Sequence, residues 1–415
     1  MSLSIKVNEM KVKIRQEEGE YLAYFLDSRR LVGVNKIGSV ILNQLFNESK
    51  KIKAITAEIS TQYDIPLSEV RKDAIDFLTA LDKEMLPDGF AVIDQKQMKA
   101  PLGVELEITT ACNLRCKHCI QDGGHHNVSM KFSKVQSIID TLSKAGVCEV
   151  SLIGGEPFLH KDILAIIEYC QNADMTVNVV TNSTLLTDDI VSELSKFKRL
   201  SLLVSLDGIS DVHDYIRGDG VFIKVSDVLR KLKKNKIAVE TLCTLNSFNI
   251  TNYREVLDYC HNLKIPCNFN LFKPFSEKHR KLTLHPHDFF DTIIELLDLR
   301  QNHGYRVGLS NAAIIAELFE LPDRNECRAT RSGLVIDVRG RMITCPSLVA
   351  TGFYDAIKLP EFSDNFLDDW KNHPVFIDFQ QKGLRECQAR AMIFSQDVNG
   401  ADPYGITAFK KYFYG

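Results

Sequence analysis

Apolar and polar residues are arranged in two different ways along this 415-residue chain. The N-terminal part begins with short alternating runs bounded by turn-forming residues, which predict three strands at residues 11–15, 20–26 and 30–34. Apolar residues then recur at every third or fourth position, which predicts three helices at residues 37–46, 51–63 and 67–86. A small sheet followed by three helices predicts a winged-helix-like α+β domain.

After a polar linker at residues 96–103, strand and helix patterns alternate regularly. Six strands are predicted, at residues 104–109, 149–153, 176–181, 200–206, 238–245 and 266–271. This alternation implies a parallel sheet with helices outside it, and hence an α/β fold. Because chemistry in parallel barrels collects at the C-terminal ends of the strands, polar residues at those ends are the candidates for a site.

The first of these strands runs directly into a cysteine-rich loop. Cys112, Cys116 and Cys119 stand at the spacing C-x3-C-x2-C. Three thiolates can hold three irons of a cubane cluster, which leaves the fourth iron open to the amino and carboxylate groups of S-adenosylmethionine (SAM). The loop resembles the cluster loop of the radical SAM superfamily, although His118 stands where that family usually has an aromatic residue near the adenine. A structural zinc site that uses His118 or His125, or three buried thiols, are the alternatives.

The second strand runs into a Gly-Gly-Glu-Pro sequence at residues 154–157, which resembles the SAM-binding turn of the same superfamily. Glycines let the backbone approach a ligand closely, and a carboxylate beside them can accept hydrogen bonds from an ammonium group. The resemblance implies further SAM contacts at the ends of the later strands. The residues expected to bind the cofactor are His118, Gly154, Gly155, Glu156, Pro157, Thr181, Asn182, Ser205, Asp207, Arg217 and Asn246.

Local roles are the alternatives for these residues. The Thr, Asn and Ser residues at strand ends could instead cap the helices that follow. Arg217 could offer a fixed cation to a carboxylate of SAM or of the substrate, or it could pair with Asp214 or Asp219 on the surface.

Three features of the N-terminal domain are the turn at residues 25–27, the exit from the sheet at residues 34–35 and the helix entry at residues 63–70. Together they resemble the RiPP recognition element, a domain related to the pyrroloquinoline quinone peptide chaperone PqqD. In that family a leader peptide adds itself as a strand to the edge of the sheet and packs against the third helix. A winged-helix domain for dimerisation or DNA binding is the alternative, and the mixed charge of the third helix argues against it.

The C-terminal part contains a second cysteine motif. Cys327, Gly340 and Cys345 form a C-x12-G-x4-C unit that brackets a predicted hairpin with Gly340 at its turn, and Cys387 follows later. This arrangement resembles the Twitch extension of radical SAM enzymes. The resemblance implies one auxiliary iron–sulfur cluster, 4Fe–4S or 2Fe–2S, on Cys327, Cys345 and Cys387. Three unrelated core cysteines are the alternative.

The expected domains are a recognition element at residues 1–98, a partial (β/α)6 barrel at 99–310 and a Twitch extension at 311–415. The net charge of −3 does not favour a nucleic-acid partner. Several of the remaining cysteines fall in apolar patterns, and no apolar run approaches the length of a membrane span. We therefore expect a cytoplasmic protein with neither a nucleic-acid nor a membrane partner.

The resemblances together imply a radical SAM enzyme that modifies a ribosomal precursor peptide, similar to sactipeptide-type synthases. Reduction by flavodoxin or ferredoxin would let the cluster on Cys112, Cys116 and Cys119 cleave SAM to a 5'-deoxyadenosyl radical, which abstracts hydrogen. A thioether or carbon–carbon crosslink is the expected product. Peptide epimerisation is the alternative, with Cys267 or Cys387 as hydrogen donor. A zinc-stabilised peptide-binding protein is the alternative that is not an enzyme.

Overall fold

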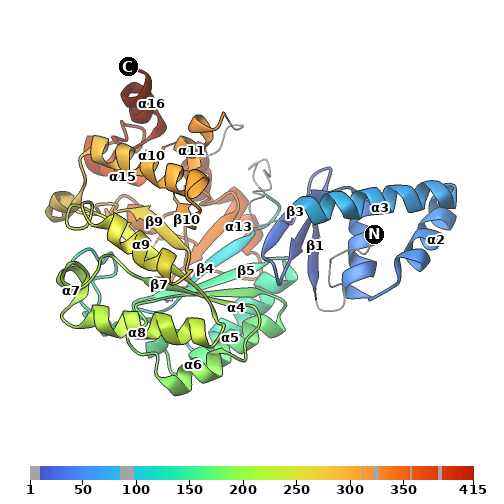
Figure 1. Cartoon of the computed structure of the whole chain (residues 1–415), viewed down its shortest axis with the longest axis horizontal. Coiled ribbons are helices and arrows are strands. Elements are labelled where there is room, and N and C mark those ends of the chain that lie inside the picture. The colour runs from blue at the N-terminus through green and yellow to red at the C-terminus, as the bar shows by residue number, and fades with distance from the viewer. Residues whose placement is uncertain (1–9, 85–97, 311, 321–326, 356–357, 382–385) are drawn as a thin grey trace.

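The structure is a computed structural model that describes residues 10–84, 98–310, 312–320, 327–355, 358–381 and 386–415. The predicted linker at residues 96–103 lies partly outside this range. The described residues form a small N-terminal unit that packs beside a large unit built on a parallel sheet (Figure 1).

The N-terminal unit has the three strands and three helices that the sequence predicts. Its antiparallel sheet has the order β1-β2-β3, with β1 at Val12–Gln16, β2 at Tyr21–Phe25 and β3 at Arg30–Val34. The helices that follow are α1 (Lys36–Leu42) with its π-helical continuation η2 (Asn43–Asn47), α2 (Ile52–Tyr63) and α3 (Leu67–Glu84). Asn35 caps α1, because its side-chain oxygen accepts a hydrogen bond from Gly38 N at 2.8 Å.

The large unit contains the six predicted strands, all parallel and adjacent in chain order. They are β4 (Gly103–Thr109), β5 (Glu149–Gly154), β6 (Thr176–Thr181), β7 (Leu200–Ser205), β8 (Ala238–Leu245) and β9 (Cys267–Leu271). β10 (Val307–Leu309) adds to β9, so that the helical crossovers continue one strand further than expected.

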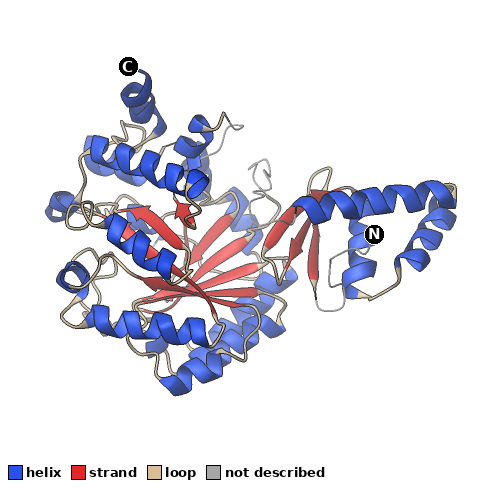
Figure 2. Ribbon diagram, in the orientation of Figure 1, coloured by secondary structure: helices blue, strands red, loops and turns tan. Residues whose placement is uncertain are grey.

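Helices cover the outer face of this sheet, as Figure 2 shows. They are α4 (Phe132–Lys144), α5 (Ile163–Asn172), α6 (Asp188–Leu194), α7 (Asp211–Arg217), α8 (Val221–Lys234), α9 (Tyr253–Asn262) and α10 (Pro286–Asn302). On β4, the alternate residues Leu106 and Ile108 are buried in the core beneath the helices, whereas Glu105 and Glu107 line a cavity on the other face. The period of two along each strand therefore gives the inner face its polar residues.

The C-terminal residues extend the same sheet. β11 (Gly333–Ile336) and β12 (Met342–Ile343) form the predicted hairpin, and Gly340 adopts a positive φ of 88° in the connection. β11 also pairs in parallel with β4, which the sequence did not predict. The described sheet therefore has nine strands in the order β10-β9-β8-β7-β6-β5-β4-β11-β12. Residues on both sides of the expected boundary at residue 310 contribute to it.

Short helices complete the C-terminal part. They are α11 (Ala312–Leu318), α12 (Pro346–Ala350), α13 (Phe366–Asn372), α14 (Pro374–Gln381), α15 (Gln388–Ser395) and α16 (Ile406–Tyr414). The aromatic residues of the last segment pack on α10, with Phe409 and Phe290 at 5.3 Å between ring centroids. Within the described range, no helix combines the length and the apolar character that crossing a bilayer requires.

The sheet of the N-terminal unit is buried on both faces. Ala23 and Phe25 of β2 belong to the core formed with helices α1 to α3. Leu22, Tyr24 and Leu26 point the opposite way and belong to the core of the large unit. The small sheet thus forms one layer between its own helices and the large unit, and the contact between the two units is an extension of the large unit's core.

Polar contacts fix this junction. Tyr24 Oη donates to a carboxylate oxygen of Glu149 at 2.5 Å and lies 3.1 Å from Thr176 Oγ1. Arg29, in the turn between β2 and β3, donates to the side chain of Asn178 and to the carbonyl oxygen of Val177. Because these groups lie at the start of β5 and β6, the N-terminal unit docks at the end of the sheet opposite to the cysteine loop.

Candidate radical SAM site

The three cysteines of the loop after β4 line one cavity of about 760 Å³. All three are half-buried. The sulfur of Cys112 accepts a hydrogen bond from Leu114 N at 3.4 Å, and that of Cys119 accepts one from Gly123 N at 3.3 Å. Hydrogen bonds to sulfur favour the thiolate form and tune iron–sulfur clusters, so this loop has donors suited to such a group.

Burial and charge act in opposite directions on these thiols. Burial raises the pKa of Cys112, and it raises that of Cys116 to about 11. The guanidinium of Arg217 opposes both shifts, and its Nη1 lies 3.9 Å from the sulfur of Cys116. A thiol must lose its proton to bind iron, so Arg217 favours the ligating state of Cys116.

The glycine pair after β5 makes room for the cysteine loop. A Cβ atom on Gly154 would lie 2.0 Å from the carbonyl oxygen of Thr109, and one on Gly155 would lie 2.3 Å from that of Ala111. Gly155 N also donates to Thr109 O at 2.9 Å. The expected reason for these glycines was close approach of a ligand, whereas in the structure they allow close approach of the loop backbone.

Glu156 is fully buried and already has donors within the protein. Its carboxylate accepts hydrogen bonds from Thr181 Oγ1 and Asn182 N, each at 2.7 Å, and from Phe158 N at 3.1 Å. We expected this carboxylate to accept from the ammonium group of a ligand. Instead it joins the end of β5 to the end of β6, and neither Glu156 nor Pro157, which begins the short helix η3 (Pro157–Leu159), lines the cavity.

The junction made by Glu156 brings Asn182 beside the cysteine loop. Asn182 Nδ2 lies 3.9 Å from the sulfur of Cys112 and donates to Asn113 Oδ1 at 3.0 Å. Thr181, Asn182 and Ser205 all line the cavity, as do the two glycines. The structure therefore gathers most of the expected strand-end residues around the cysteines.

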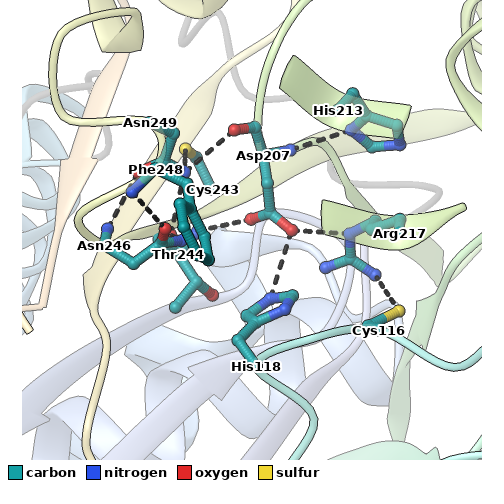
Figure 3. A network of polar contacts seen from close by, with 10 residues as sticks. All are labelled: Cys116, His118, Asp207, His213, Arg217, Cys243, Thr244, Asn246, Phe248 and Asn249. Carbon is teal, nitrogen blue, oxygen red and sulfur yellow. Dashed lines mark hydrogen bonds and ion pairs between the residues drawn. The ribbon is translucent and has the colours of Figure 1, made fainter. Parts of the chain in front are cut away.

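A buried carboxylate, that of Asp207, connects the cysteine loop to the ends of β7 and β8 (Figure 3). Its Oδ2 accepts from Arg217 Nε at 2.6 Å and lies 3.2 Å from His118 Nε2, while its Oδ1 accepts from Thr244 N at 2.8 Å. Burial alone would raise the pKa of Asp207, but the charges of Arg217 and His118 hold it well below its usual range. Asp207 is therefore ionised.

This network argues against one alternative and against one expected cofactor contact. Arg217 pairs with Asp207 and not with Asp214, whose carboxylate instead accepts backbone hydrogen bonds from Gly220 and Phe222. Asp207 itself supports the site from behind and does not line the cavity.

Asn246 shapes the turn after β8 and does not line the cavity either. Its side chain donates to Thr244 O at 2.8 Å and accepts from Phe248 N at 2.9 Å. The expected contact between Asn246 and the cofactor is therefore not supported. Asn249, which sequence reasoning missed, donates to the carbonyl oxygen of Asp207 at 2.9 Å, and its place three residues later in the same polar turn was the available signal.

His118 and Arg217 keep polar atoms available toward the cavity that they line. The side chain of His118 is 9% exposed. Its Nδ1 atom is buried and accepts or donates no hydrogen bond among the described residues. An orphaned ring nitrogen beside three cysteines fits a polar ligand bound next to a cluster.

The C-terminal cysteines lie at the same cavity. Cys327 and Cys345 line it, and Cys387 packs against them in a small buried cluster. Burial raises the pKa of Cys345, and it raises that of Cys327 to about 12, while the cation of Lys273 opposes both shifts. The two cysteine motifs, separated by two hundred residues of sequence, thus face one cavity.

Cys267, the hydrogen donor considered for epimerisation, faces away from this cavity. It is fully buried in the core with Cys260 of α9 as a neighbour. Asn270 and Leu271, at the end of β9, line the cavity, whereas Cys267 at its start does not. Because side chains alternate along a strand, Cys267 points to the helices, and its proposed role as donor is wrong.

Two family models match the chain. The model of the radical SAM superfamily matches residues 106–263, and that of the coenzyme PQQ synthesis protein D (PqqD) matches residues 20–86. Together these segments contain the cysteine loop, the glycine pair and almost the whole N-terminal unit. They favour an iron–sulfur cluster and SAM over the zinc alternative.

Relatives of known function are also similar. The mycofactocin maturase MftC of Mycobacterium tuberculosis is 25% identical over 294 residues, which cover 69% of this chain and 74% of MftC. The sporulation killing factor maturation protein SkfB of Bacillus subtilis is 26% identical over 209 residues, which cover 49% of this chain and 51% of SkfB. The crystal structure of Streptococcus suis SuiB bound to S-adenosylmethionine has the same fold, with a TM-score of 0.67, 16% identity and coverage of 89% of each chain.

The donor set and the matched models agree on the cofactors. A radical SAM domain implies a 4Fe–4S cluster and SAM, and the loop with its three thiols, its hydrogen bonds to sulfur and the orphaned nitrogen of His118 fits both groups. The chain therefore contains a radical SAM domain at residues 106–263 and a PqqD-type domain at residues 20–86.

Proposed function

We propose that this protein modifies a ribosomally made precursor peptide and forms a thioether or carbon–carbon crosslink in it. The observation that carries the proposal is the single cavity lined by cysteines of both motifs, in a chain that also has a PqqD-type domain. MftC is named a maturase and SkfB a maturation protein, which supports a maturation reaction of this kind.

In this proposal Cys112, Cys116 and Cys119 hold the 4Fe–4S cluster. When the cluster and SAM are bound, they supply a carbon-centred radical that abstracts a hydrogen atom from the substrate. His118 Nδ1, Asn182 and the outer guanidinium nitrogens of Arg217 offer hydrogen bonds to the polar groups of SAM.

The protein around this site fixes these side chains. Asp207 holds Arg217 and His118 in place from behind the cavity, since it accepts from both. The carboxylate of Glu156 holds the ends of β5 and β6 together beneath the loop. A radical can attack whatever lies near it, so rigid walls protect the protein as well as the product.

The N-terminal domain, residues 1–98, would hold the leader peptide at the edge of β3. At the other edge of the sheet, the side chain of Asn47 already uses the backbone groups of Val12 in β1. It accepts from Val12 N at 3.1 Å and donates to Val12 O at 2.8 Å. Within the described residues β3 pairs with β2 alone, which leaves its outer edge for a peptide strand. A tethered leader raises the effective concentration of the core peptide at the barrel, residues 99–310.

The C-terminal extension, residues 311–415, would hold one auxiliary cluster, 4Fe–4S or 2Fe–2S, on Cys327, Cys345 and Cys387. Formation of a crosslink removes two hydrogens from the peptide. One would leave as the abstracted hydrogen atom, and the other as a proton and an electron. The proton would pass to solvent, and the auxiliary cluster would take up the electron. A flavodoxin or ferredoxin would reduce the cluster at the first motif.

The test uses full-length protein reconstituted without oxygen, SAM, a reductant and the short peptide encoded next to its gene. Mass spectrometry should find a peptide lighter by two hydrogens, together with 5'-deoxyadenosine. The variant Cys112→Ala/Cys116→Ala/Cys119→Ala should form neither. An unchanged peptide mass with deuterium uptake from heavy water would indicate epimerisation instead, and no 5'-deoxyadenosine from protein with a verified cubane cluster would overturn the proposal.

A further inference from the structure

Lys273 places a positive charge in the cavity between the two cysteine motifs. It follows the end of β9, two residues after Leu271, and lines the cavity together with Cys327 and Cys345. Its side chain faces the open space of the cavity, but the surrounding protein still desolvates the charge in part. The residue follows β9 of the parallel sheet, whereas the cysteines come from the C-terminal residues after position 310.

No described residue neutralises this cation. The ammonium of Lys273 forms no ion pair or hydrogen bond within the described part of the chain, whereas the nearby guanidinium of Arg390 pairs with Asp402 at 2.7 Å in full burial. An unpaired cation in a cavity is costly unless a negative group enters beside it.

When deprotonated, as iron binding requires, the C-terminal cysteines become the negative groups that act on Lys273. The charges of Cys387, Cys345 and Cys327 raise the pKa of Lys273 even though burial lowers it. The carboxylate of Glu105 on the cavity wall also feels this charge, but the three sulfurs dominate.

We propose that Lys273 is the charge partner of the auxiliary cluster and raises its reduction potential. This inference rests on the proposed function, which places that cluster on Cys327, Cys345 and Cys387. Reduction adds one negative charge to the cluster, and a cation close by stabilises the reduced form more than the oxidised form. A higher potential makes the cluster a better acceptor for the electron that crosslinking releases. Lys273 is thus a positioning and tuning residue of the acceptor site.

The test isolates the auxiliary cluster in the full-length Cys112→Ala/Cys116→Ala/Cys119→Ala background. Lys273→Met and Lys273→Arg are introduced there, and the midpoint potential is followed by redox titration with electron paramagnetic resonance. Iron and sulfide per chain are measured for each protein. Lys224→Met, on the exposed face of α8, controls for loss of one positive charge far from the cavity.

We expect Lys273→Met to shift the midpoint potential to a more negative value, and Lys273→Arg and Lys224→Met to leave it near that of the parent. Loss of the cluster from Lys273→Met, with retention in Lys273→Arg, would equally support a required positive charge. An unchanged midpoint potential in Lys273→Met at full iron content would overturn this inference and leave the proposed function intact. Absence of any cluster from the parent protein would overturn both the inference and the auxiliary cluster of the proposed function.

Discussion

Arg217 and His118 share one carboxylate oxygen of Asp207, at 2.6 Å from Arg217 Nε and 3.2 Å from His118 Nε2. His118 lies between two cysteines of the first motif, and Arg217 ends α7. Asp207 at the end of β7 therefore couples the position of the loop to that of the guanidinium beside Cys116. Arg217 and His118, which line the cavity, are thus held in position by Asp207, which does not line it.

Replacing Asp207 with Asn should destabilise the protein strongly. The change leaves the buried guanidinium of Arg217, whose side chain is 11% exposed, without its counter-charge. Breaking a buried pair in this way costs about 3–5 kcal/mol of the free energy of unfolding. Urea unfolding of the metal-free protein under anaerobic conditions measures it.

Asp211→Asn is the matched control, because Asp211 lies at an exposed position of α7, the helix that Arg217 ends. It should change the free energy of unfolding by less than about 0.5 kcal/mol. The double variant Asp207→Asn/Arg217→Met should recover part of the loss, since it removes the uncompensated charge as well. Equal effects of Asp207→Asn and Asp211→Asn would contradict the coupling described here.

The imidazole of His213 should make stability depend on pH. Its Nδ1 accepts from Asp207 N at 3.1 Å, and burial, assisted by the charge of Arg217, lowers the pKa of His213 from 6.5 to about 4. Between these two values the unfolded state binds a proton that the folded state excludes, so stability falls as the pH falls from about 6.5 to about 4. The full effect is about 3 kcal/mol, at about 1.4 kcal/mol per pKa unit.

The measurement compares unfolding free energies at pH 7 and pH 5 for the wild type and for His213→Asn, whose side-chain oxygen can still accept from Asp207 N. The decrease toward pH 5 should be smaller in the variant. His303→Asn, at an exposed histidine, should keep the decrease of the wild type. If His213→Asn and the wild type lose the same stability over this interval, another group is responsible.

The sequence predicted the strands and helices well because each run had a clear period. Six parallel strands and the cysteine loop followed from alternating patterns and from spacing, both of which are local. Cys267 stands at the start of β9 and on the face opposite to Asn270, which together would have placed it away from the strand ends that form the site. That signal was available and was missed.

Other features depend on partners that are remote in sequence. The run Tyr21–Phe25 is apolar almost throughout, and only the structure shows that the large unit covers its second face. Pairing of β11 with β4 joins residues more than two hundred positions apart. The need for Gly154 likewise comes from Thr109 on a neighbouring strand, which no local pattern reveals.

Gly154→Ala should therefore displace the cysteine loop. The new Cβ would meet Thr109 O at 2.0 Å. Gly154 also has a φ of 146°, which residues other than glycine rarely adopt. We expect much less iron and sulfide per chain after anaerobic reconstitution, with secondary structure retained by circular dichroism. Gly103→Ala, on the same pair of strands, meets its nearest atom only at 3.4 Å and should bind iron like the wild type. Full iron content in Gly154→Ala would show that the loop can move aside.

Tyr24→Phe should loosen the junction between the N-terminal unit and the large unit. Burial raises the pKa of Tyr24, so its hydroxyl stays protonated and donates to Glu149. Without it, the carboxylate of Glu149 and the hydroxyl of Thr176 lose a buried partner, which costs about 1–3 kcal/mol. Hydrogen exchange measured by mass spectrometry should show faster exchange in β2 and at the start of β6, while the cysteine loop at the other end of the sheet stays as protected as before.

Lys11→Met removes an exposed ion pair with Asp174 at the same junction and should change exchange little, because exposed pairs contribute about 0–1 kcal/mol. Equal exchange in Tyr24→Phe and Lys11→Met would mean that apolar packing alone holds the two units together.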